Sequence, residues 1–449
     1  MSLEIMLKTF EKHSEKDAII RKGQSYNYRW LLDRIDFWTD TIHQKNISPG
    51  TVTIIEADFS PNSVALLLAL IQHQCILVPL TSAANANRPE FIEIAQGEIS
   101  FIIDQEDQCQ IEKLPYSADH EFYQQLKQLN HPGLVLFSSG STGKSKAAVH
   151  NLNKILEKFK VPRHSLRTIT FLLYDHIGGI NTLFYTLSNS GCLITLQSRT
   201  PDETLEAIDK YQAELLPTSP TFINLILLSE VYKRYSLKSL KTVTYGTEPM
   251  PESTLKRFHE LFPHIRLLQT YGLSELGILR SKSKSSDSLW VKIGGEGFQT
   301  RIVDGILQIK AHSAMLGYLN AASPFTEDGW FNTNDAVQVN GEFIKILGRQ
   351  SEIINVGGEK VYPAEVENVI QEMENVSEVT IYGEENFITG NIVCAKVSLT
   401  HHEETKLFIV RLKKFCGESL ETFKIPVKVK VTYEPLYSER FKKVRAVKP

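Results

Sequence analysis

The stretch from Leu134 to His150 constrains this chain more than any other, because it joins a buried strand to a loop suited to anions. Its first residues, Leu134–Phe137, are continuously apolar and predict a strand buried on both faces. Glycine in the next segment lets the backbone turn several N–H groups into one concavity, while hydroxyls add donors and lysines add charge. The composition therefore predicts a phosphate-binding loop, formed by Ser138, Ser139, Gly140, Ser141, Thr142, Gly143 and Lys146.

The loop alone fits two classes of enzyme. P-loop NTPases carry a glycine, four further residues and then Gly-Lys-Ser/Thr. Here Gly143-Lys144-Ser145 supplies that ending, but Ser138 stands where the first glycine belongs. The run SGSTGKSKA, residues 139–147, also resembles the signature of the adenylate-forming superfamily, with Ser145 in place of a proline. That superfamily includes acyl- and aryl-CoA ligases, luciferases and peptide-synthetase adenylation domains.

Length and composition exclude several other classes. The 449 residues are too many for one compact core, and 42% hydrophobic and 22% charged residues are ordinary for a globular protein. A formal charge of -3 gives no reason to expect nucleic acid. The five scattered cysteines argue against a disulfide framework and for a reducing cytoplasm. The longest strongly apolar run, Val64–Ile71, is far shorter than the ~18–20 residues of a membrane span, so we expect a cytoplasmic protein without a membrane partner.

Strands and helices are expected to alternate along most of the chain. Thr51–Ala57 and Cys75–Leu80 predict strands, with an apolar helix at Asn62–His73 between them. Residues 1–50 are expected to be helical, and Leu215–Thr218 to connect two helices. The alternation indicates α/β layers with mostly parallel sheets.

Two changes of pattern divide the chain. From Val291 to Ile346 short apolar runs alternate with glycine turns, which is typical of a small barrel. After Gly348 the expected elements make a compact α+β unit. We therefore predict an α/β protein in which residues 1–347 form a large N-terminal domain of layered α/β sheets with a small β-barrel. Residues 348–449 form a smaller α+β C-terminal domain.

Four further motifs, in order and at the expected spacing, favour the adenylate-forming superfamily over the NTPases. They are similar to the family's Tyr-Gly-x-Thr-Glu, its Gly-Trp-Phe-x-Thr-Gly-Asp, its hinge Gly-Arg and its turn-and-helix segment. In this chain they are Tyr271–Glu275, Gly329–Asp335 with Asn334 for glycine, Gly348-Arg349 and Asn355–Glu367. The only remaining support for a P-loop NTPase is the tripeptide Gly143-Lys144-Ser145.

The resemblance implies how nucleotide and metal are bound. Tyr271 stacks on adenine beside Gly272, and Ser274 bonds near the α-phosphate. Glu275 is the Mg²⁺ ligand, since a carboxylate can hold that ion between phosphates and protein. The other implied nucleotide contacts are Asp335 and Arg349 at the ribose, and Gly246, Thr247, Glu248 and Pro249, which line the adenine and acyl pocket.

Two more catalytic residues follow from the resemblance. His176 lies at the end of a predicted strand, where the family has a His beside the tunnel that binds the acid. Near the C-terminus the family carries Gly-Lys-x-x-Arg, and Arg445 sets the register here. Lys442 is then the catalytic candidate, with Phe441 in place of the glycine, and Lys443 is the alternative. The run KAAVH, residues 146–150, is most similar to the succinylbenzoate-CoA ligase branch.

The resemblance implies a two-step reaction that uses ATP, Mg²⁺ and CoA. A small carboxylic acid attacks the α-phosphate of ATP to give acyl-adenylate and pyrophosphate, while the loop and Lys442 hold negative charge. The mobile C-terminal domain then rotates and brings Gly357 and Gly358 toward the thiol of CoA. Two alternatives stay open: an acyl carrier protein as the acceptor, and a degenerate nucleotide-binding homologue. The second is prompted by departures from the family at Ser145, Asn334, Ser351 and Phe441.

Overall fold

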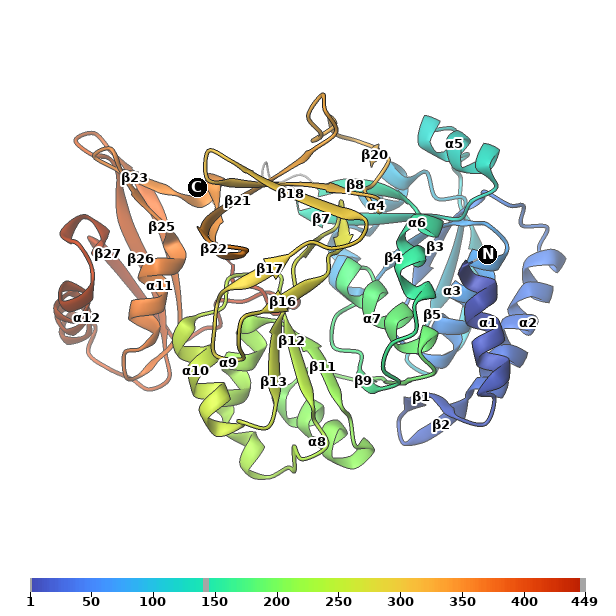
Figure 1. Ribbon diagram of the computed structural model, residues 1–449, viewed down its shortest axis with the longest axis horizontal. Coiled ribbons are helices and arrows are strands. Elements are labelled where there is room, and N and C mark those ends of the chain that lie inside the picture. The colour runs from blue at the N-terminus through green and yellow to red at the C-terminus, as the bar shows by residue number, and fades with distance from the viewer. Residues whose placement is uncertain (1, 140–144, 445–449) are drawn as a thin grey trace.

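The computed structural model describes residues 2–139 and 145–444 (Figure 1). Gly140, Ser141, Thr142 and Gly143 of the expected phosphate loop lie outside these residues, and so does Arg445.

One sheet carries the two strands that flank the expected loop. Its strand order is β20-β8-β7-β4-β3-β5-β6. The strands β7, β4, β3 and β5 are parallel, whereas β8 pairs antiparallel with β7. Their bounds are β3 (Val52–Glu56), β4 (Ile76–Leu80), β5 (Ile99–Ile103), β6 (Cys109–Lys113), β7 (Gly133–Ser139), β8 (Ser145–Asn151) and β20 (Gly317–Tyr318).

A second sheet has the order β13-β12-β11-β9-β10-β1-β2. All its pairs are parallel except the β1–β2 hairpin. Its strands are β1 (Asp17–Arg21), β2 (Gln24–Asn27), β9 (Arg167–Ile169), β10 (Cys192–Ile194), β11 (Leu215–Thr218), β12 (Thr242–Tyr245) and β13 (Arg266–Gln269).

The helix α3 (Pro61–Gln72) packs in the core cluster that joins the two sheets. Its N-terminus is closed by a capping box, in which Ser60 and Ser63 each accept the backbone N–H of the other. Nearly all its residues are buried, as a helix that is apolar all round requires. The expected apolar helix is thus an internal layer of an α/β sandwich, together with α2 (Tyr28–Gln44) and α7 (Ile177–Ser188).

Further helices cover the outer faces of the two sheets. Apolar side chains of α8, α9 and α10 pack on the second sheet, and those of α4 and α5 on the first. The bounds of these helices are α4 (Arg88–Ala95), α5 (Glu121–Leu129), α8 (Pro201–Tyr211), α9 (Pro220–Ser229) and α10 (Glu252–Leu261). The helices α1 (Ser2–Lys12) and α6 (Leu152–Leu156) instead pack in the core cluster that contains α3.

A curved antiparallel sheet follows, in the order β16-β17-β22-β21-β19-β18. It encloses its own small core and corresponds to the small barrel expected between Val291 and Ile346. Its strands are β16 (Ser281–Ser283), β17 (Val291–Ile293), β18 (Phe298–Val303), β19 (Ile306–Ala311), β21 (Phe331–Asn340) and β22 (Phe343–Arg349), and the short pair β14 (Gly272–Leu273) and β15 (Gly277–Ile278) precedes it.

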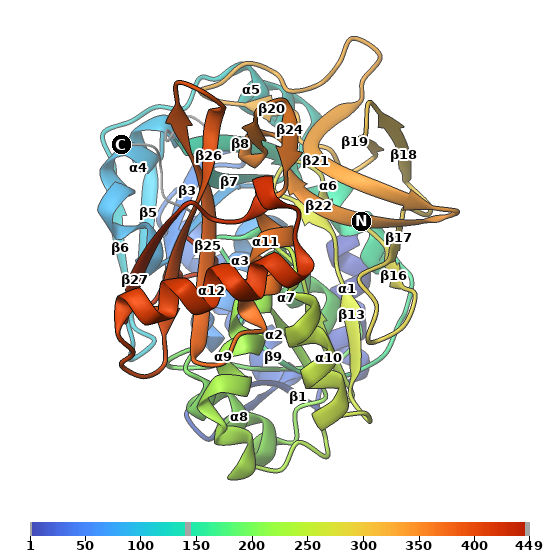
Figure 2. The ribbon, with the colours of Figure 1, turned by 90° about the vertical axis from the view of Figure 1, so that its left-hand side faces the viewer.

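The last part of the chain forms a separate sheet with its own core, which faces the viewer in Figure 2 with α12 in front. In it β25 and β26 pair antiparallel over a long register, and β27 adds to β26 in parallel. The elements are β23 (Ile354–Val356), β24 (Glu359–Val361), α11 (Pro363–Gln371), β25 (Val376–Asn386), β26 (Gly390–Leu399), α12 (Thr405–Ser419) and β27 (Lys428–Thr432). The α+β character expected after Gly348 is confirmed.

The expectation that residues 1–50 are helical is wrong for the β1–β2 hairpin. Lys22 and Gly23 both have positive φ, at 49° and 82°, which is the geometry of a two-residue hairpin turn. Ile19 and Ile20 are buried beside β10. The glycine after a short β-branched run was the signal for this turn.

The segment Leu215–Thr218 is a strand, not the expected connection. It is buried throughout and pairs in parallel with β12 along its length. A proline in a central strand normally argues against that assignment. Here β9 pairs with β11 only at Leu215, so Pro217 lies beyond the paired part of that edge.

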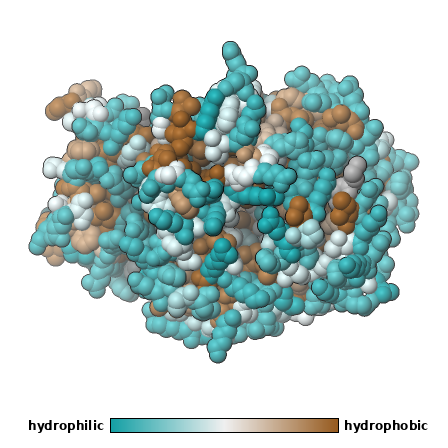
Figure 3. Space-filling view, in the orientation of Figure 1, coloured by the Kyte–Doolittle hydropathy of each residue, from teal (hydrophilic) through white to brown (hydrophobic). Residues whose placement is uncertain are grey.

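Hydrophilic residues cover most of the face in Figure 3, and hydrophobic ones lie in small groups. Among the described helices, none combines the length and the hydropathy needed to cross a membrane.

We predict that Gly179→Ala destabilises the fold, because α7 passes very close to the preceding loop. A Cβ at Gly179 would lie 2.1 Å from the carbonyl oxygen of Leu173, which is backbone and cannot turn away. Overpacking of this kind costs roughly 1–3 kcal/mol, measurable as a lower denaturant midpoint.

Gly178→Ala is the matched control for this test. Its Cβ would meet the end of the Leu172 side chain at 2.8 Å, and that side chain can shift. Equal destabilisation by the two variants would contradict the close-approach argument.

Candidate active site

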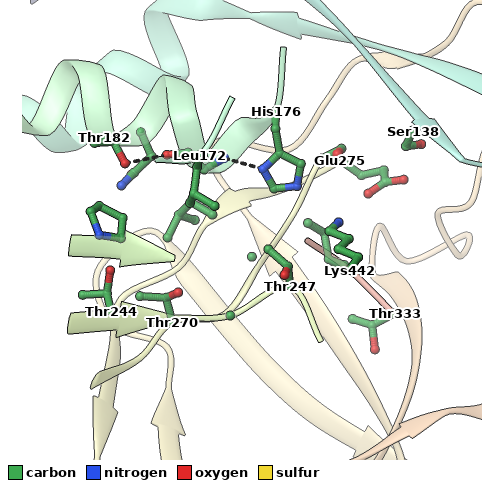
Figure 4. Close-up of a pocket in the computed structure, with 18 of the residues that line it drawn as sticks. Ser138, Leu172, His176, Thr182, Thr244, Thr247, Thr270, Glu275, Thr333 and Lys442 are labelled. Carbon is green, nitrogen blue, oxygen red and sulfur yellow. Dashed lines mark hydrogen bonds between the residues drawn. The ribbon is translucent and has the colours of Figure 1, made fainter. Parts of the chain in front are cut away.

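A cavity of about 810 Å³ lies where the second sheet, α7, the curved sheet and the C-terminal tail meet. Figure 4 shows Ser138, Glu275, Thr333 and Lys442 at one side, and Thr182 and Thr244 at the other. The cavity brings together many residues that the sequence singled out. Those that line it are Ser138, Lys146, His176, Gly246, Thr247, Gly272, Ser274, Glu275, Arg349 and Lys442.

Glu275 is the one carboxylate among the described residues that line the cavity. Its Oε1 accepts a hydrogen bond of 2.6 Å from the hydroxyl of Tyr318, whose ring lies 5.3 Å from the ammonium of Lys146. Tyr318 was missed by the sequence analysis, since it belongs to a two-residue strand with no recognisable pattern. A single carboxylate suits Mg²⁺, which in nucleotide enzymes takes one or two carboxylates and completes its shell with phosphates and water.

His150 connects the β7–β8 hairpin to the Tyr271–Glu275 motif. Its ring is fully buried, and Nε2 lies 2.6 Å from the backbone oxygen of Ser274. Burial lowers the pKa of His150 to about 4, although the Ser274 contact opposes this. The ring is therefore neutral, donates from Nε2, and fixes Ser274 at the cavity wall.

Two predicted nucleotide contacts, Tyr271 and Asp335, lie behind the cavity wall. Both are buried, and the Tyr271 hydroxyl donates to Oδ2 of Asp335. Oδ1 of Asp335 lies 2.8 Å from Nε of Arg349, which itself lines the cavity. Burial raises the pKa of Asp335, while Arg349 and the Tyr271 hydrogen bond lower it. In this arrangement Asp335 orients Arg349 through an ion pair. The contact of Asp335 with the ribose stays a prediction.

Four other predicted residues do not line the cavity. The Glu248 carboxylate accepts the backbone N–H groups of Thr221 and Lys443, both at 2.9 Å. Pro249 follows it. Gly357 and Gly358 form the turn between β23 and β24 with φ of 61° and 95°. Apart from their chain neighbours, no atom of the described residues lies within 4 Å of where their Cβ atoms would be, so both glycines are open to an approaching molecule.

His176 caps the N-terminus of α7 and faces the cavity (Figure 4). Its Nδ1 accepts the N–H of Gly178 at 3.0 Å, so the neutral ring carries its hydrogen on Nε2. Burial lowers the pKa of His176 well below 6.5, and the charges of Lys442 and Arg440 lower it further. The residue is a neutral donor at the cavity wall.

The C-terminal tail reaches the cavity through an unusual turn at Phe441. Its φ is 51°, a left-handed conformation that favours glycine, and Phe441 stands where the family pattern has glycine. The ring packs 5.3 Å from Phe171 and 5.2 Å from Phe222, and Ser219 donates to the Phe441 carbonyl at 2.7 Å. The backbone shape expected of glycine is thus retained with a different side chain.

Polar contacts on both sides of Phe441 hold the tail and separate the two candidate lysines. Nη2 of Arg440 lies 2.8 Å from Oδ2 of the buried Asp175. The ammonium of Lys443 lies 3.1 Å from the buried carboxylate of Glu367 in α11. Lys442 lines the cavity instead.

The Lys442 ammonium has both cations and carboxylates in its neighbourhood. Burial lowers its pKa most, Arg440 and Arg349 lower it further, and Glu248 and Asp175 raise it. The described structure gives this ammonium no ion pair with a carboxylate. An anion entering the cavity would favour its charged form.

Residues 7–304 match the family model of the AMP-binding enzyme, and residues 365–440 match that of the AMP-binding enzyme C-terminal domain. The first match alone spans more than half of the chain. The chain therefore belongs to the AMP-binding enzyme family, and the resemblance to the adenylate-forming superfamily is confirmed.

Two curated relatives illustrate the similarity. The indoleacetate–CoA ligase of Aromatoleum aromaticum is 27% identical over 59% of this chain, and the match spans 57% of that ligase. The 2-succinylbenzoate–CoA ligase of Enterococcus faecalis is 23% identical over 94% of this chain and 93% of its own length.

Solved structures confirm the fold class. The anthranilate CoA ligase AuaEII in complex with anthranoyl-AMP has a TM-score of 0.82 at 16% identity, covering 98% of this chain and 95% of that one. The o-succinylbenzoate CoA synthetase MenE from Bacillus subtilis, in complex with the acyl-adenylate intermediate OSB-AMP, has a TM-score of 0.77 at 19% identity. It covers 98% of this chain and 96% of its own.

We predict that His150 makes the fold sensitive to acid. Its pKa is about 6.5 when unfolded and about 4 when folded, so the unfolded state binds more protons between these values. This contribution is fully present above pH 6.5 and is lost as the pH falls to 4, at a cost on the order of 3 kcal/mol. Denaturant unfolding of wild type and His150→Gln at several pH values measures it.

The variant removes the titrating group, so its stability should fall less steeply between pH 6.5 and 4. Parallel pH profiles for the two proteins would show that His150 is not the group responsible.

Proposed function

We propose that this chain is an AMP-forming acid–thiol ligase that activates a small carboxylic acid with ATP and transfers the acyl group to CoA. The observation that carries the proposal is that the tail places Lys442 in the same cavity as Glu275, His176 and Lys146. The family assignment and the CoA ligases among the relatives support it.

In the proposed first step a carboxylate oxygen attacks the α-phosphate and pyrophosphate leaves. Both reactants are anionic, and their repulsion is the main obstacle to reaction. Lys442 and Lys146 line the cavity and supply the positive charge that offsets this repulsion. Neutral His176 donates from Nε2 without competing for a proton.

Glu275 is the residue proposed to hold Mg²⁺, whose chemistry is to neutralise phosphate charge. The Tyr318 hydrogen bond orients its carboxylate at the cavity wall. Ser138 and Ser274 add polar groups nearby. Tyr271 and Asp335 remain proposed nucleotide contacts. Arg349, which is paired with Asp335, lines the cavity itself.

In the proposed second step residues 348–449 rotate as a mobile domain against residues 1–347. Rotation has to release the Arg440–Asp175 ion pair and withdraw Phe441 from Phe171 and Phe222. The turn at Gly357 and Gly358 then approaches the thiol, since no side chain in the described part of the chain covers these glycines.

The backbone argues against a degenerate homologue. Two family glycines are replaced, by Asn334 and Phe441, yet both residues keep positive φ, at 57° and 51°. Asparagine is among the non-glycine residues that adopt this conformation most readily. Both residues thus adopt a backbone conformation that glycine reaches easily, so neither replacement requires a different backbone there.

The proposed compartment is the reducing cytoplasm, supported by cysteines that are all free thiols, four of them buried.

We predict that Lys442→Ala slows acyl-adenylate formation far more than thioester formation from pre-formed acyl-adenylate. Loss of one charge-assisted contact to a developing charge costs about 2–4 kcal/mol, or roughly 10²–10³ in rate. In the second step the rotated domain has carried the lysine away. Single-turnover assays of each half-reaction, in the variant and in wild type, measure how much each of the two steps is slowed.

Lys443→Ala is the matched control, because its ammonium is bound to Glu367 outside the cavity. It should leave the ratio of the two half-reactions unchanged, even if both become slower. A Lys442→Ala enzyme impaired equally in both steps would contradict the two-conformation mechanism.

A further inference from the structure

The cavity does not end at His176 but continues along one face of the second sheet. Alternate residues of β12 explain this: Thr242 and Thr244 line the cavity, whereas Val243 and Tyr245 point into the core against α8, α9 and α10. From Gly246 to Thr242 this wall spans about 13 Å, at the usual rise per strand residue.

The opposite wall is one face of α7. Gly178, Asn181, Thr182 and Tyr185 line the cavity, and their spacing of three, one and three residues keeps them on one side of a helix. Gly178 and Tyr185 are about 10 Å apart along the axis. The slot between the two walls is therefore long enough for an extended acid.

The slot is partly polar. Leu172, Leu215 and Leu268 supply apolar surface, but threonine and asparagine side chains from both walls interrupt it. In Figure 4 Thr182 and Thr244 lie on the side away from Glu275 and Lys442. The Thr182 hydroxyl donates to the carbonyl of Gly178 at 2.8 Å, and Oδ1 of Asn181 accepts from Lys158. These polar side chains reduce the apolar surface that the slot offers to a plain alkyl chain.

The far end of the slot carries the positive charge of Arg266, at the start of β13. His164 also lines this end, and both side chains are solvent-exposed. Among the described residues neither has an ion pair, and the only lining carboxylate, Glu275, belongs to the opposite end. Arg163 and the backbone N–H of His164 both oppose the rise in pKa that burial gives Tyr185, so donors and positive charge gather at this end.

Resting on the proposed ligase activity, we infer that the substrate is an elongated acid with a second anionic group, which binds Arg266 and His164 about 10 Å from the carboxylate that is activated. Lys442 and Arg266 thus receive the two ends of one molecule. The guanidinium suits a carboxylate because it can donate two parallel hydrogen bonds.

The test is acid-dependent pyrophosphate release with straight-chain dicarboxylic acids of increasing length, each paired with the monocarboxylic acid of the same length. Wild type should prefer the dicarboxylic acid of one length range. Arg266→Ala should raise the KM for that acid about tenfold and leave the KM for its monocarboxylic partner unchanged. Arg266→Lys, which keeps the charge, should restore part of the preference.

Arg257→Ala is the matched control, since Arg257 is an exposed arginine of α10 outside the cavity. It should behave as wild type. A wild type that prefers the monocarboxylic acids, or an Arg266→Ala enzyme that loses both classes equally, would overturn the inference while leaving the ligase activity in place. No pyrophosphate release with any acid would instead refute the proposed function, and the inference with it.

Discussion

The chemistry of the cavity depends on the docking of Phe441 against the large domain. A left-handed turn costs a non-glycine residue roughly 1–2 kcal/mol. The Phe441 ring has aromatic neighbours in Phe171, Phe222 and Tyr437, and each such pair is worth about 0.5–1.5 kcal/mol beyond the area it buries. Contacts of this size are comparable to the strain and offset it, and the phenylalanine ring anchors the tail in a way that a glycine could not. The next residue, Lys442, is positioned as a result.

The charged groups near Phe441 favour the binding of an anion in the cavity. Burial is the largest cause that lowers the pKa of both Lys442 and His176, and Arg440 lowers both further, whereas Glu248 and Asp175 raise the pKa of Lys442. A bound carboxylate or phosphate would raise the pKa of Lys442 as well, because an opposite charge nearby stabilises the ammonium. The Arg440–Asp175 pair ties this arrangement to α7, the helix that also forms one wall of the slot for the acid. Because Arg440 docks the tail and Lys442 lines the cavity only two residues later, docking of the tail is coupled to the binding of anions.

The pattern of apolar residues predicted the layers of the fold, because α3 and its flanking strands β3 and β4 are apolar nearly throughout and are buried. It failed for β11, where a proline obscured the strand, and for β1–β2, where a short hairpin lay between helices. Motifs predicted the residues that converge on the cavity. They could not predict Tyr318, His150 as a buried support, or Asp335 behind Arg349, because these depend on which segments meet in three dimensions.

The central claim is that a carboxylate oxygen attacks the α-phosphate of ATP in this cavity. The direct measurement is a complete reaction with an acid whose carboxylate carries heavy oxygen, followed by mass analysis of the products. The account predicts one labelled oxygen in AMP, because the bridging oxygen of the acyl-adenylate stays with the phosphorus when the thiol attacks the carbonyl carbon. Label in inorganic phosphate, with ADP as the other product, would contradict it.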